Sequence, residues 1–177
     1  MASEERQLKI DEVMRNRLRG VRFILEDVHD PHNAAAILRT ADALGIGEVW
    51  YVFVEQKEYN PKKVGRESSS SANKWVNTPV FTNRDEVFAR LKKEHVVSIA
   101  TTIHEEGARE LWDVDFSIEN VAVWVGNEHR GLSREVIDAS DIKLTIPMSG
   151  FVESLNVSVS AALVMGEIVR QRRSATV

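Results

Sequence analysis

Two polar side chains, Ser154 and Asn156, stand where a glycine-containing loop runs into an apolar segment with helical periodicity. A hydroxyl or amide at such a place either caps the helix, by accepting hydrogen bonds from its first backbone N–H groups, or lines a binding site. The apolar positions that would bury one face of this helix are Val157, Ala161, Val164, Met165 and Ile168. Taken alone, the stretch favours the capping interpretation.

Several kinds of chemistry are excluded or disfavoured by what the chain lacks. It contains no cysteine, which excludes disulfides, thiolate metal ligands and a cysteine nucleophile. His29 and His32 are three residues apart, but Pro31 between them argues against a metal-binding pair on one helix face, and we predict no metal site. The G-x-G-x-x-G, P-loop and G-x-S-x-G signatures are absent, which argues against a dinucleotide oxidoreductase, a P-loop NTPase and an α/β-hydrolase.

Short apolar runs alternate with amphipathic helical runs along the chain. The predicted strands, rich in β-branched and aromatic residues, are residues 22–28, 49–54, 96–100, 121–126 and 142–146. The predicted helices are residues 33–44, 84–94, 133–139 and 154–172, with a further N-terminal helix over residues 4–19. This order predicts an α/β fold with a mainly parallel sheet and flanking helices.

Four unusual polar segments follow predicted strands, which is where ligands bind in open α/β sheets. They are HDPHNAAAILRTADALG after Val28, TTIHEEG after Ala100, GNEHRGL after Val125 and PMSGFVESLN after Ile146. The triplet from Ser154 to Asn156 is therefore one of several polar groups expected at the same edge of the sheet. This grouping shifts the interpretation towards a functional site.

Each polar segment also has a structural interpretation. Asn33 could simply cap the helix that follows it, and Arg39 could be an ordinary surface arginine. The apolar positions that would face the core from that helix are Ile37, Leu38, Ala41 and Leu44. Glu128 could pair with its neighbour His129 or Arg130.

Length and charge bound the class of protein. The 177 residues, 43% of them hydrophobic, suffice for one globular domain. A formal net charge of −4 argues against a strongly basic nucleic-acid binder, because phosphate contacts supply most of the sequence-independent affinity. Basic residues nevertheless gather in three clusters: Arg15, Arg17, Arg19 and Arg22; Lys62, Lys63 and Arg66; and Arg170, Arg172 and Arg173. They could also belong to solvated faces.

The ends and loops of the chain give further expectations. The N-terminus is charged and lacks an apolar signal core, and no apolar run is long enough to span a bilayer, so we expect a cytoplasmic protein. The low-complexity stretch SSSSANKWV, residues 68–76, is expected to form a surface loop.

Three segments together resemble the ordered motifs of the SpoU/TrmH family of SPOUT RNA ribose 2′-O-methyltransferases. They are HDPHNAAAILRTADALGIGEV, VWVGNEHRGLSREVIDASDIKLTIPM and FVESLNVSVSAALV, and the resemblance runs from about Phe23 to Arg173. It implies the cofactor S-adenosylmethionine, an RNA substrate, a homodimer and a trefoil knot near the C-terminus. Within the family the chain most resembles the members that methylate guanosine 18 in the tRNA D-loop.

The resemblance also implies roles for particular residues. Those matched to the catalytic positions are Asn33, Arg39, Glu128, Ser154 and Asn156, and those matched to cofactor-binding positions are Thr101, Gly126, Ile146 and Leu155. Arg39 matches the residue proposed to deprotonate or orient the ribose hydroxyl. An arginine is not expected to lose its proton, so we leave open whether Arg39 is a base or a clamp.

The resemblance implies a division into an N-terminal helical extension, residues 1–20, and a SPOUT methyltransferase domain, residues 21–177. Other interpretations remain open at this point. The target could be another tRNA nucleoside or ribosomal RNA, or the chain could be a non-catalytic RNA-binding factor. Small residues on the last helix would suit close packing in a dimer, or equally close packing on the chain's own sheet: Ser158, Ala161, Ala162 and Gly166.

Overall fold

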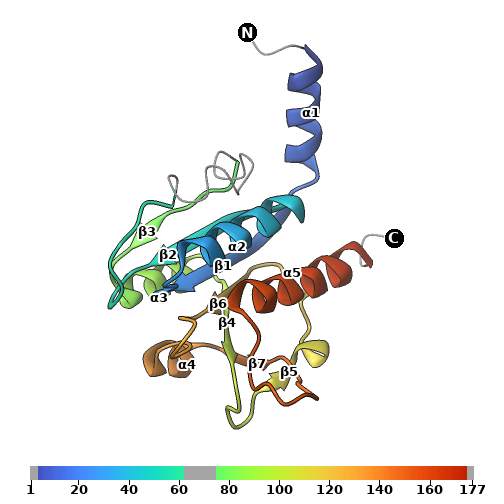
Figure 1. Ribbon diagram of the computed structural model, residues 1–177. Coiled ribbons are helices and arrows are strands. Elements are labelled where there is room, and N and C mark those ends of the chain that lie inside the picture. The colour runs from blue at the N-terminus through green and yellow to red at the C-terminus, as the bar shows by residue number, and fades with distance from the viewer. Residues whose placement is uncertain (1–3, 62–74, 175–177) are drawn as a thin grey trace.

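The computed structural model describes residues 4–61 and 75–174, which form an α/β fold (Figure 1). The helices are α1 (Glu4–Arg15), α2 (Pro31–Ala43), α3 (Arg84–Lys93), the 3-10 helix η2 (Leu111–Asp113), α4 (Arg134–Ala139) and α5 (Val157–Ser174). The strands are β1 (Leu18–Glu26), β2 (Ile46–Val52), β3 (Val80–Phe81), β4 (Val97–Thr102), β5 (Arg109–Glu110), β6 (Val121–Val125) and β7 (Ile142–Thr145). The predicted fold class is confirmed.

The strands of the described residues form one seven-stranded sheet in the order β3-β2-β1-β6-β4-β7-β5. Every neighbouring pair is parallel, as predicted. All five residues of β6 are buried. Central strands of a parallel sheet are continuous apolar runs because helices cover both of their faces.

Helices cover both faces of this sheet (Figure 1). Phe23 and Leu25 of β1 belong to the core cluster that holds the buried sides of α2 and α5. The residue between them, Ile24, belongs to the cluster that holds Val87 of α3 and Val136 of α4. The predicted helical stripes are confirmed by side chains at most 1% exposed: Ile37, Leu38, Ala41, Ala161, Val164, Met165 and Ile168. α2 and α5 thus share one face, where they pack against each other.

The N-terminal helix is shorter than predicted, and the first strand begins earlier. α1 ends at Arg15, not at residue 19, and β1 begins at Leu18, not at residue 22. Gly20 adopts φ +71, and a Cβ there would lie 2.0 Å from the Glu119 carbonyl oxygen, so the position requires glycine. Arg19 and Arg22, which the prediction placed at the end of the helix and the start of the strand, therefore both lie in β1. The register of β1 against β2 shifts between Leu18 and Arg22. α1 stands away from the sheet (Figure 1), and none of its residues is buried.

Other boundaries also differ from the predictions. β3 and β5 were not predicted, because strands of two residues show no periodicity. β1 ends at Glu26, not at residue 28, and α5 begins at Val157, not at residue 154. The basic cluster of residues 62–66 and most of the predicted loop 68–76 lie outside the described residues. Within the described ranges, no helix has the length and apolar character needed to cross a membrane.

Candidate active site

The four polar segments follow β1, β6, β4 and β7, and these strands are consecutive neighbours in the sheet. Because the strands are parallel, their carboxyl ends meet at one edge of the sheet. The prediction that the segments share this edge is therefore confirmed.

A pocket of about 650 Å³ lies at this edge, among the turns that follow β4, β6 and β7. Pockets for small molecules and cofactors typically enclose about 300–1,000 Å³. The four residues predicted to bind a cofactor all line the pocket: Thr101, Gly126, Ile146 and Leu155. Three of the predicted catalytic residues line it as well: Glu128, Ser154 and Asn156.

Glu128 is held by three hydrogen bonds from the start of α2. Its carboxylate accepts from the backbone N–H of His29 at 2.8 Å and of Asp30 at 3.1 Å, and from Asn33 Nδ2 at 2.8 Å. Burial raises the pKa of the Glu128 carboxyl, but the hydrogen bonds from Asn33 and these backbone groups outweigh it and hold that pKa below its ordinary value. Glu128 is thus a carboxylate at neutral pH. In the structure its carboxylate bonds to this turn, not to the side chain of His129 or Arg130.

Asn33 connects Glu128 to the loop before α5. Its Nδ2 donates to Glu128, and its Oδ1 accepts from Asn156 Nδ2 at 3.0 Å. Asn156 in turn caps α5, because its Oδ1 accepts from the backbone N–H and the hydroxyl of Ser158, at 2.8 and 2.6 Å. One hydrogen-bonded chain therefore joins the three motifs, and Asn156 combines capping with a place in the pocket wall.

The interpretation of Asn33 as a helix cap is wrong. α2 begins two residues earlier, at Pro31, and Asp30 is its cap, with a side chain that accepts from the His32 backbone N–H at 2.8 Å. Proline suits the first helical position because its φ is already helical and it has no N–H to satisfy. The Asn33 side chain is thereby left to bond Glu128 and Asn156.

Arg39 lies apart from the pocket of its own chain. It is on the exposed side of α2 and does not line the pocket. Six helical residues separate it from Asn33, a rise of about 9 Å and a rotation of about 120° around the helix axis. Within one chain, the structure brings together Asn33, Glu128, Ser154 and Asn156 but not Arg39.

Carboxylates line another part of the pocket: Glu105, Glu110 and Glu153. Glu105 contacts Lys143 at 3.1 Å and Arg134 at 3.0 Å. Hydrogen bonds from Lys143 and Arg134 lower the pKa of the Glu105 carboxyl against the effect of burial. The lining thus combines charged groups with apolar side chains of the sheet edge: Val125, Leu132, Leu144 and Ile146.

Sequence reasoning missed residues that hold the wall of the pocket. Asn127 donates from Nδ2 to the Asp27 backbone carbonyl at 2.8 Å, and Asp27 is fully buried. A signal was present, because the acidic pair Glu26 and Asp27 stands at the end of an apolar run. Buried carboxylates are uncommon unless they are paired, so this pair marks a place where the structure must supply partners.

The chain matches the model of the SpoU rRNA Methylase family over residues 20–166. It is 39% identical to the tRNA (guanosine(18)-2′-O)-methyltransferase of Thermus thermophilus, over 98% of this chain and 86% of that protein. The crystal structure of the A. aeolicus TrmH/SpoU tRNA modifying enzyme superimposes with a TM-score of 0.89 at 28% identity, covering 99% of this chain and 87% of that one.

A further neighbour contains a cofactor. The SpoU methyltransferase AviRb from Streptomyces viridochromogenes, in complex with AdoMet, matches with a TM-score of 0.75 at 27% identity, over 92% of this chain and 62% of that one. The family match covers most of the chain, and it includes the pocket and the three motifs joined by Asn33, Glu128 and Asn156. The chain therefore belongs to the SpoU methylase family.

Proposed function

We propose that this protein methylates a ribose 2′-hydroxyl in RNA with S-adenosylmethionine, and that its target is guanosine 18 of tRNA. The observation that carries the proposal is the pocket at the sheet edge, with the chain from Asn156 through Asn33 to Glu128 at its wall. The target follows relatives that match nearly the whole of this chain and are named for guanosine 18 of tRNA.

The residues of the pocket fit S-adenosylmethionine. The flat adenine base of the cofactor can pack on the apolar side chains of Ile146 and Leu155. Backbone groups at the strand ends can form hydrogen bonds with the polar edge of that base. The Thr101 hydroxyl, at the pocket end of β4, is bonded to the Trp124 carbonyl at 2.8 Å. When bound, the cofactor supplies a methyl group on a sulfonium that leaves as a neutral thioether, so the reaction needs no metal to stabilise a leaving group.

The protein's own task is to position and deprotonate. A ribose hydroxyl is a weak nucleophile whose proton must be removed or held as it attacks, and alignment of two bound reactants supplies much of the acceleration. In the proposed site, Glu128 and Asn33 fix the start of α2, Ser154 and Asn156 fix the loop before α5, and Arg39 holds the ribose or its phosphate.

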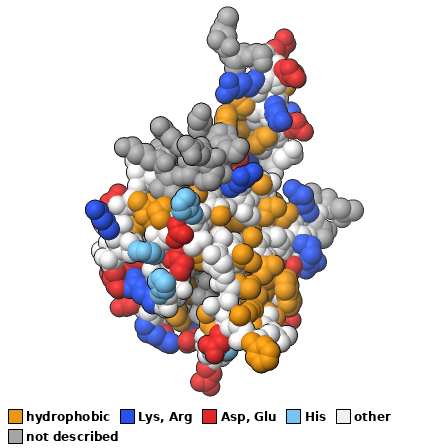
Figure 2. Space-filling view, in the orientation of Figure 1, with side chains coloured by type: hydrophobic (Ala, Val, Ile, Leu, Met, Phe, Trp, Pro, Cys, Tyr) orange, Lys and Arg blue, Asp and Glu red, His pale blue; other side chains and the backbone are white. Residues whose placement is uncertain are grey.

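We propose that Arg39 reaches the reaction from a second copy of the chain. Its exposed position outside its own pocket supports this arrangement. Apolar side chains gather on the surface over α5 and the loop before it (Figure 2), and they include Phe151, Val152, Val159 and Leu163. Contiguous exposed apolar surface marks an interaction site, and a symmetric homodimer would cover it in both copies.

A C-terminal trefoil knot is also part of the proposal. In the sheet, β4 and β6 lie between β7 and β1. After β7 the chain nevertheless returns far enough for α5 to pack against α2, the helix that follows β1. Near its end, Gln171 donates to the Val114 carbonyl at 2.9 Å and accepts from the Phe116 N–H at 2.8 Å. The last helix thus lies against the earlier connection between β5 and β6, an arrangement that suits a threaded chain. The division at residue 20 and the cytoplasmic location remain predictions.

The test of the function is transfer of a labelled methyl group to an unmodified tRNA transcript. A 2′-O-methyl group blocks alkaline cleavage, so the resistant linkage maps the modified nucleotide. We expect one resistant linkage, 3′ of guanosine 18, and no transfer to a transcript with 2′-deoxyguanosine there. Transfer to another tRNA nucleoside or only to ribosomal RNA contradicts the target, and cofactor binding without any transfer supports a non-catalytic RNA-binding factor.

Replacing Gly126 with alanine is expected to weaken cofactor binding about tenfold, because overpacking costs about 1–3 kcal/mol and here displaces the pocket wall. The new Cβ would lie 2.2 Å from the Gly131 carbonyl carbon and 2.3 Å from the Leu132 nitrogen, both backbone atoms that cannot rotate away. Calorimetric titration with S-adenosylmethionine measures the effect. Gly150→Ala is the control, since nothing lies within 4 Å of its Cβ; equal affinities in the two variants would contradict the prediction.

A further inference from the structure

Asp27 directly follows β1 and has a left-handed backbone conformation. Its φ is +49, and its side chain is fully buried. Left-handed backbone is uncommon for residues other than glycine, although aspartate tolerates it better than most. Such a conformation persists only where the surrounding structure enforces it.

The buried carboxylate of Asp27 accepts hydrogen bonds from two segments, and its Oδ2 also lies 3.8 Å from a guanidinium nitrogen of Arg84. Oδ1 accepts from the consecutive backbone N–H groups of Val54, Glu55 and Gln56, at 2.8, 3.2 and 3.0 Å. Oδ2 accepts from the guanidinium of Arg130 at 2.5 Å. Arg130 also pairs with Glu55. A buried charge is tolerated when it is paired and hydrogen-bonded in this way.

Both contacts of Asp27 with the pocket wall are made to one loop. This loop, which we call the pocket loop, runs from Asn127 to Gly131, and its ends are bonded to each other by backbone hydrogen bonds of 3.0 and 2.9 Å. Asp27 holds it through its backbone carbonyl, which accepts from Asn127, and through its carboxylate, which accepts from Arg130. Asn127 and Arg130 line the pocket, whereas Asp27 does not.

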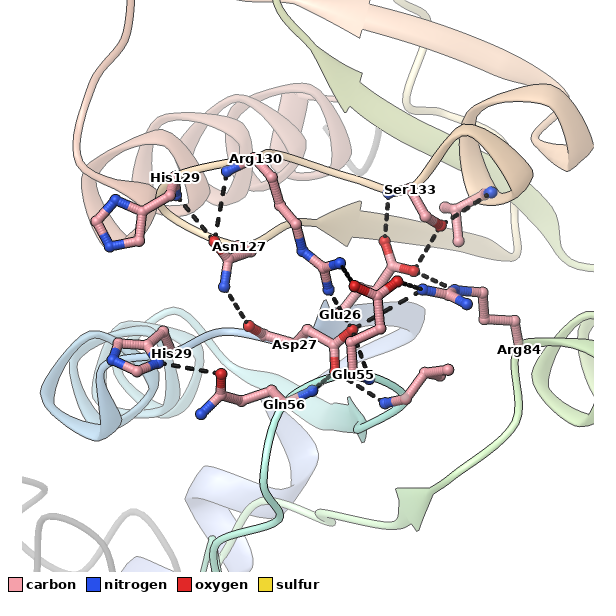
Figure 3. A network of polar contacts seen from close by, with 12 residues as sticks. Glu26, Asp27, His29, Glu55, Gln56, Arg84, Asn127, His129, Arg130 and Ser133 are labelled. Carbon is pink, nitrogen blue, oxygen red and sulfur yellow. Dashed lines mark hydrogen bonds and ion pairs between the residues drawn. The ribbon is translucent and has the colours of Figure 1, made fainter.

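The neighbouring acid holds the chain just beyond this loop. Glu26, 1% exposed, accepts from the backbone N–H of Ser133 at 2.8 Å and from its hydroxyl at 2.6 Å, and it pairs with Arg84. The acidic pair at the end of β1 therefore bonds both the pocket loop and the start of α4 (Figure 3).

We propose that Asp27 is a positioning residue of the cofactor pocket, acting through Arg130 and Asn127 to keep the pocket loop in its binding shape. The proposal rests on the proposed function in one respect, namely that S-adenosylmethionine occupies this pocket. Asp27 touches neither the pocket nor the reacting groups, so its effect on binding must pass through the loop. The Asp27–Arg130 pair is the interaction that carries this effect.

Two substitutions and their combination test the pair. Asp27→Asn retains the shape of the side chain but either loses the acceptor for Arg130 or turns an NH₂ group towards the N–H groups of residues 54–56. Arg130→Gln removes the guanidinium that pairs with Asp27; because the Arg130 side chain is 37% exposed, the change leaves no cavity in the core. Thermal unfolding checks that each variant is folded before its affinity is measured. We expect each substitution to raise the dissociation constant for S-adenosylmethionine by about tenfold. The double variant should bind the cofactor no more weakly than either single variant, because the two residues act as one unit.

A positioning role predicts more than lost stability. In transfer assays the KM for the cofactor should rise while kcat at saturating cofactor falls less than twofold. Arg130→Lys should restore part of the affinity, since its ammonium can still pair with Asp27 but cannot bond Asp27 and Glu55 together as the guanidinium does. Arg90→Gln is the matched control, because Arg90 also forms an exposed ion pair, with Glu94 on α3, away from the pocket. It should bind the cofactor like the unmodified protein.

Two results overturn the proposal. One is unchanged cofactor affinity in folded Arg130→Gln, and the other is a double variant whose loss equals the sum of the single losses in free energy. The outcome for the proposed function is separate: if Gly126→Ala also binds S-adenosylmethionine like the unmodified protein, the cofactor is not in this pocket. If Gly126→Ala weakens binding and Arg130→Gln does not, the pocket stands and the role of Asp27 fails.

Discussion

Replacing Arg39 with alanine is expected to abolish methyl transfer while cofactor affinity stays within about twofold and the protein remains folded, since a substitution of an exposed side chain seldom unfolds a protein. The side chain is exposed on α2 and does not line the pocket of its own chain. Its loss therefore leaves the pocket wall intact but removes the group proposed to hold the ribose or phosphate. Calorimetric titration, thermal unfolding and labelled transfer measure the three quantities.

Mixing Arg39→Ala with Gly126→Ala tests whether Arg39 acts in a second copy, at a cofactor concentration near the dissociation constant of the unmodified pocket, where the Gly126→Ala pocket is mostly empty. In a mixed dimer of Arg39→Ala and Gly126→Ala, one site combines an intact pocket with an intact Arg39 from the other chain. Random exchange between equal amounts of the two should restore about a quarter of the normal activity, because half of the symmetric dimers are mixed and each has one working site. If Arg39 served its own pocket, every mixed dimer would be inactive. Loss of cofactor binding in Arg39→Ala alone would instead indicate a structural role.

The elements that position the site could be predicted because they are long and strongly patterned. The helices α2 and α5 bury the stripes that their spacing predicts, and the central strands are uninterrupted apolar runs. The common position of the four polar segments at one edge of the sheet could also be predicted, because each segment follows a strand and the strands are parallel. The strand order was not available from the sequence, since β4 lies between β6 and β7 only through long-range pairing.

Two features of the site could have been predicted and were not. The sequence Asp30-Pro31 is typical of a helix cap followed by the first helical residue, so α2 could have been placed from Pro31 and Asn33 freed from the capping role. The buried pair Glu26 and Asp27 was included in a strand that was expected to continue to Val28. Acidic residues at the end of an apolar run call for partners, although the sequence does not say which.

The partners themselves depend on contacts between distant parts of the chain. Asp27 is bonded to residues 54–56 and to Arg130, and Glu128 is bonded to the turn at His29 and Asp30. No local pattern reports such contacts, because they depend on how strands far apart in sequence become neighbours. The left-handed backbone of Asp27 is likewise imposed by these contacts and not by its own preference.

Replacing Glu128 with glutamine is expected to lower methyl transfer by about a hundredfold, because it leaves a partly buried donor unbonded, at a cost of about 1–3 kcal/mol, and disturbs the alignment of the reactants. The carboxylate accepts three hydrogen bonds, from His29, Asp30 and Asn33. A glutamine would turn an NH₂ group towards at least one of these donors. The Asn33 amide would then lose its fixed orientation, and with it the hydrogen bond to Asn156.

The same substitution has a signature in the pH dependence of stability. Since the pKa of Glu128 is below its ordinary value of 4.5 in the folded protein, the unfolded state binds more protons as pH falls. Its contribution is therefore fully present above about pH 4.5 and is lost as pH falls through the folded value. As pH falls through this acid range, the melting temperature of Glu128→Gln should therefore fall less steeply than that of the unmodified protein. Methyl transfer by the variant should be reduced at every pH from about 6 to 9, where the carboxylate of the unmodified protein is ionised.

Glu86→Gln on α3 is the matched control for both measurements, because Glu86 is exposed and does not line the pocket. It should transfer methyl groups at the normal rate and retain the acid dependence of the unmodified protein. Normal transfer by Glu128→Gln would show that the chain of hydrogen bonds through Asn33 serves only the fold. A hundredfold loss of transfer with an unchanged melting temperature at neutral pH would show that Glu128 acts on the alignment of the reactants. In that case the packing of α2 and α5 would be intact, and only the rate of methyl transfer would be lower.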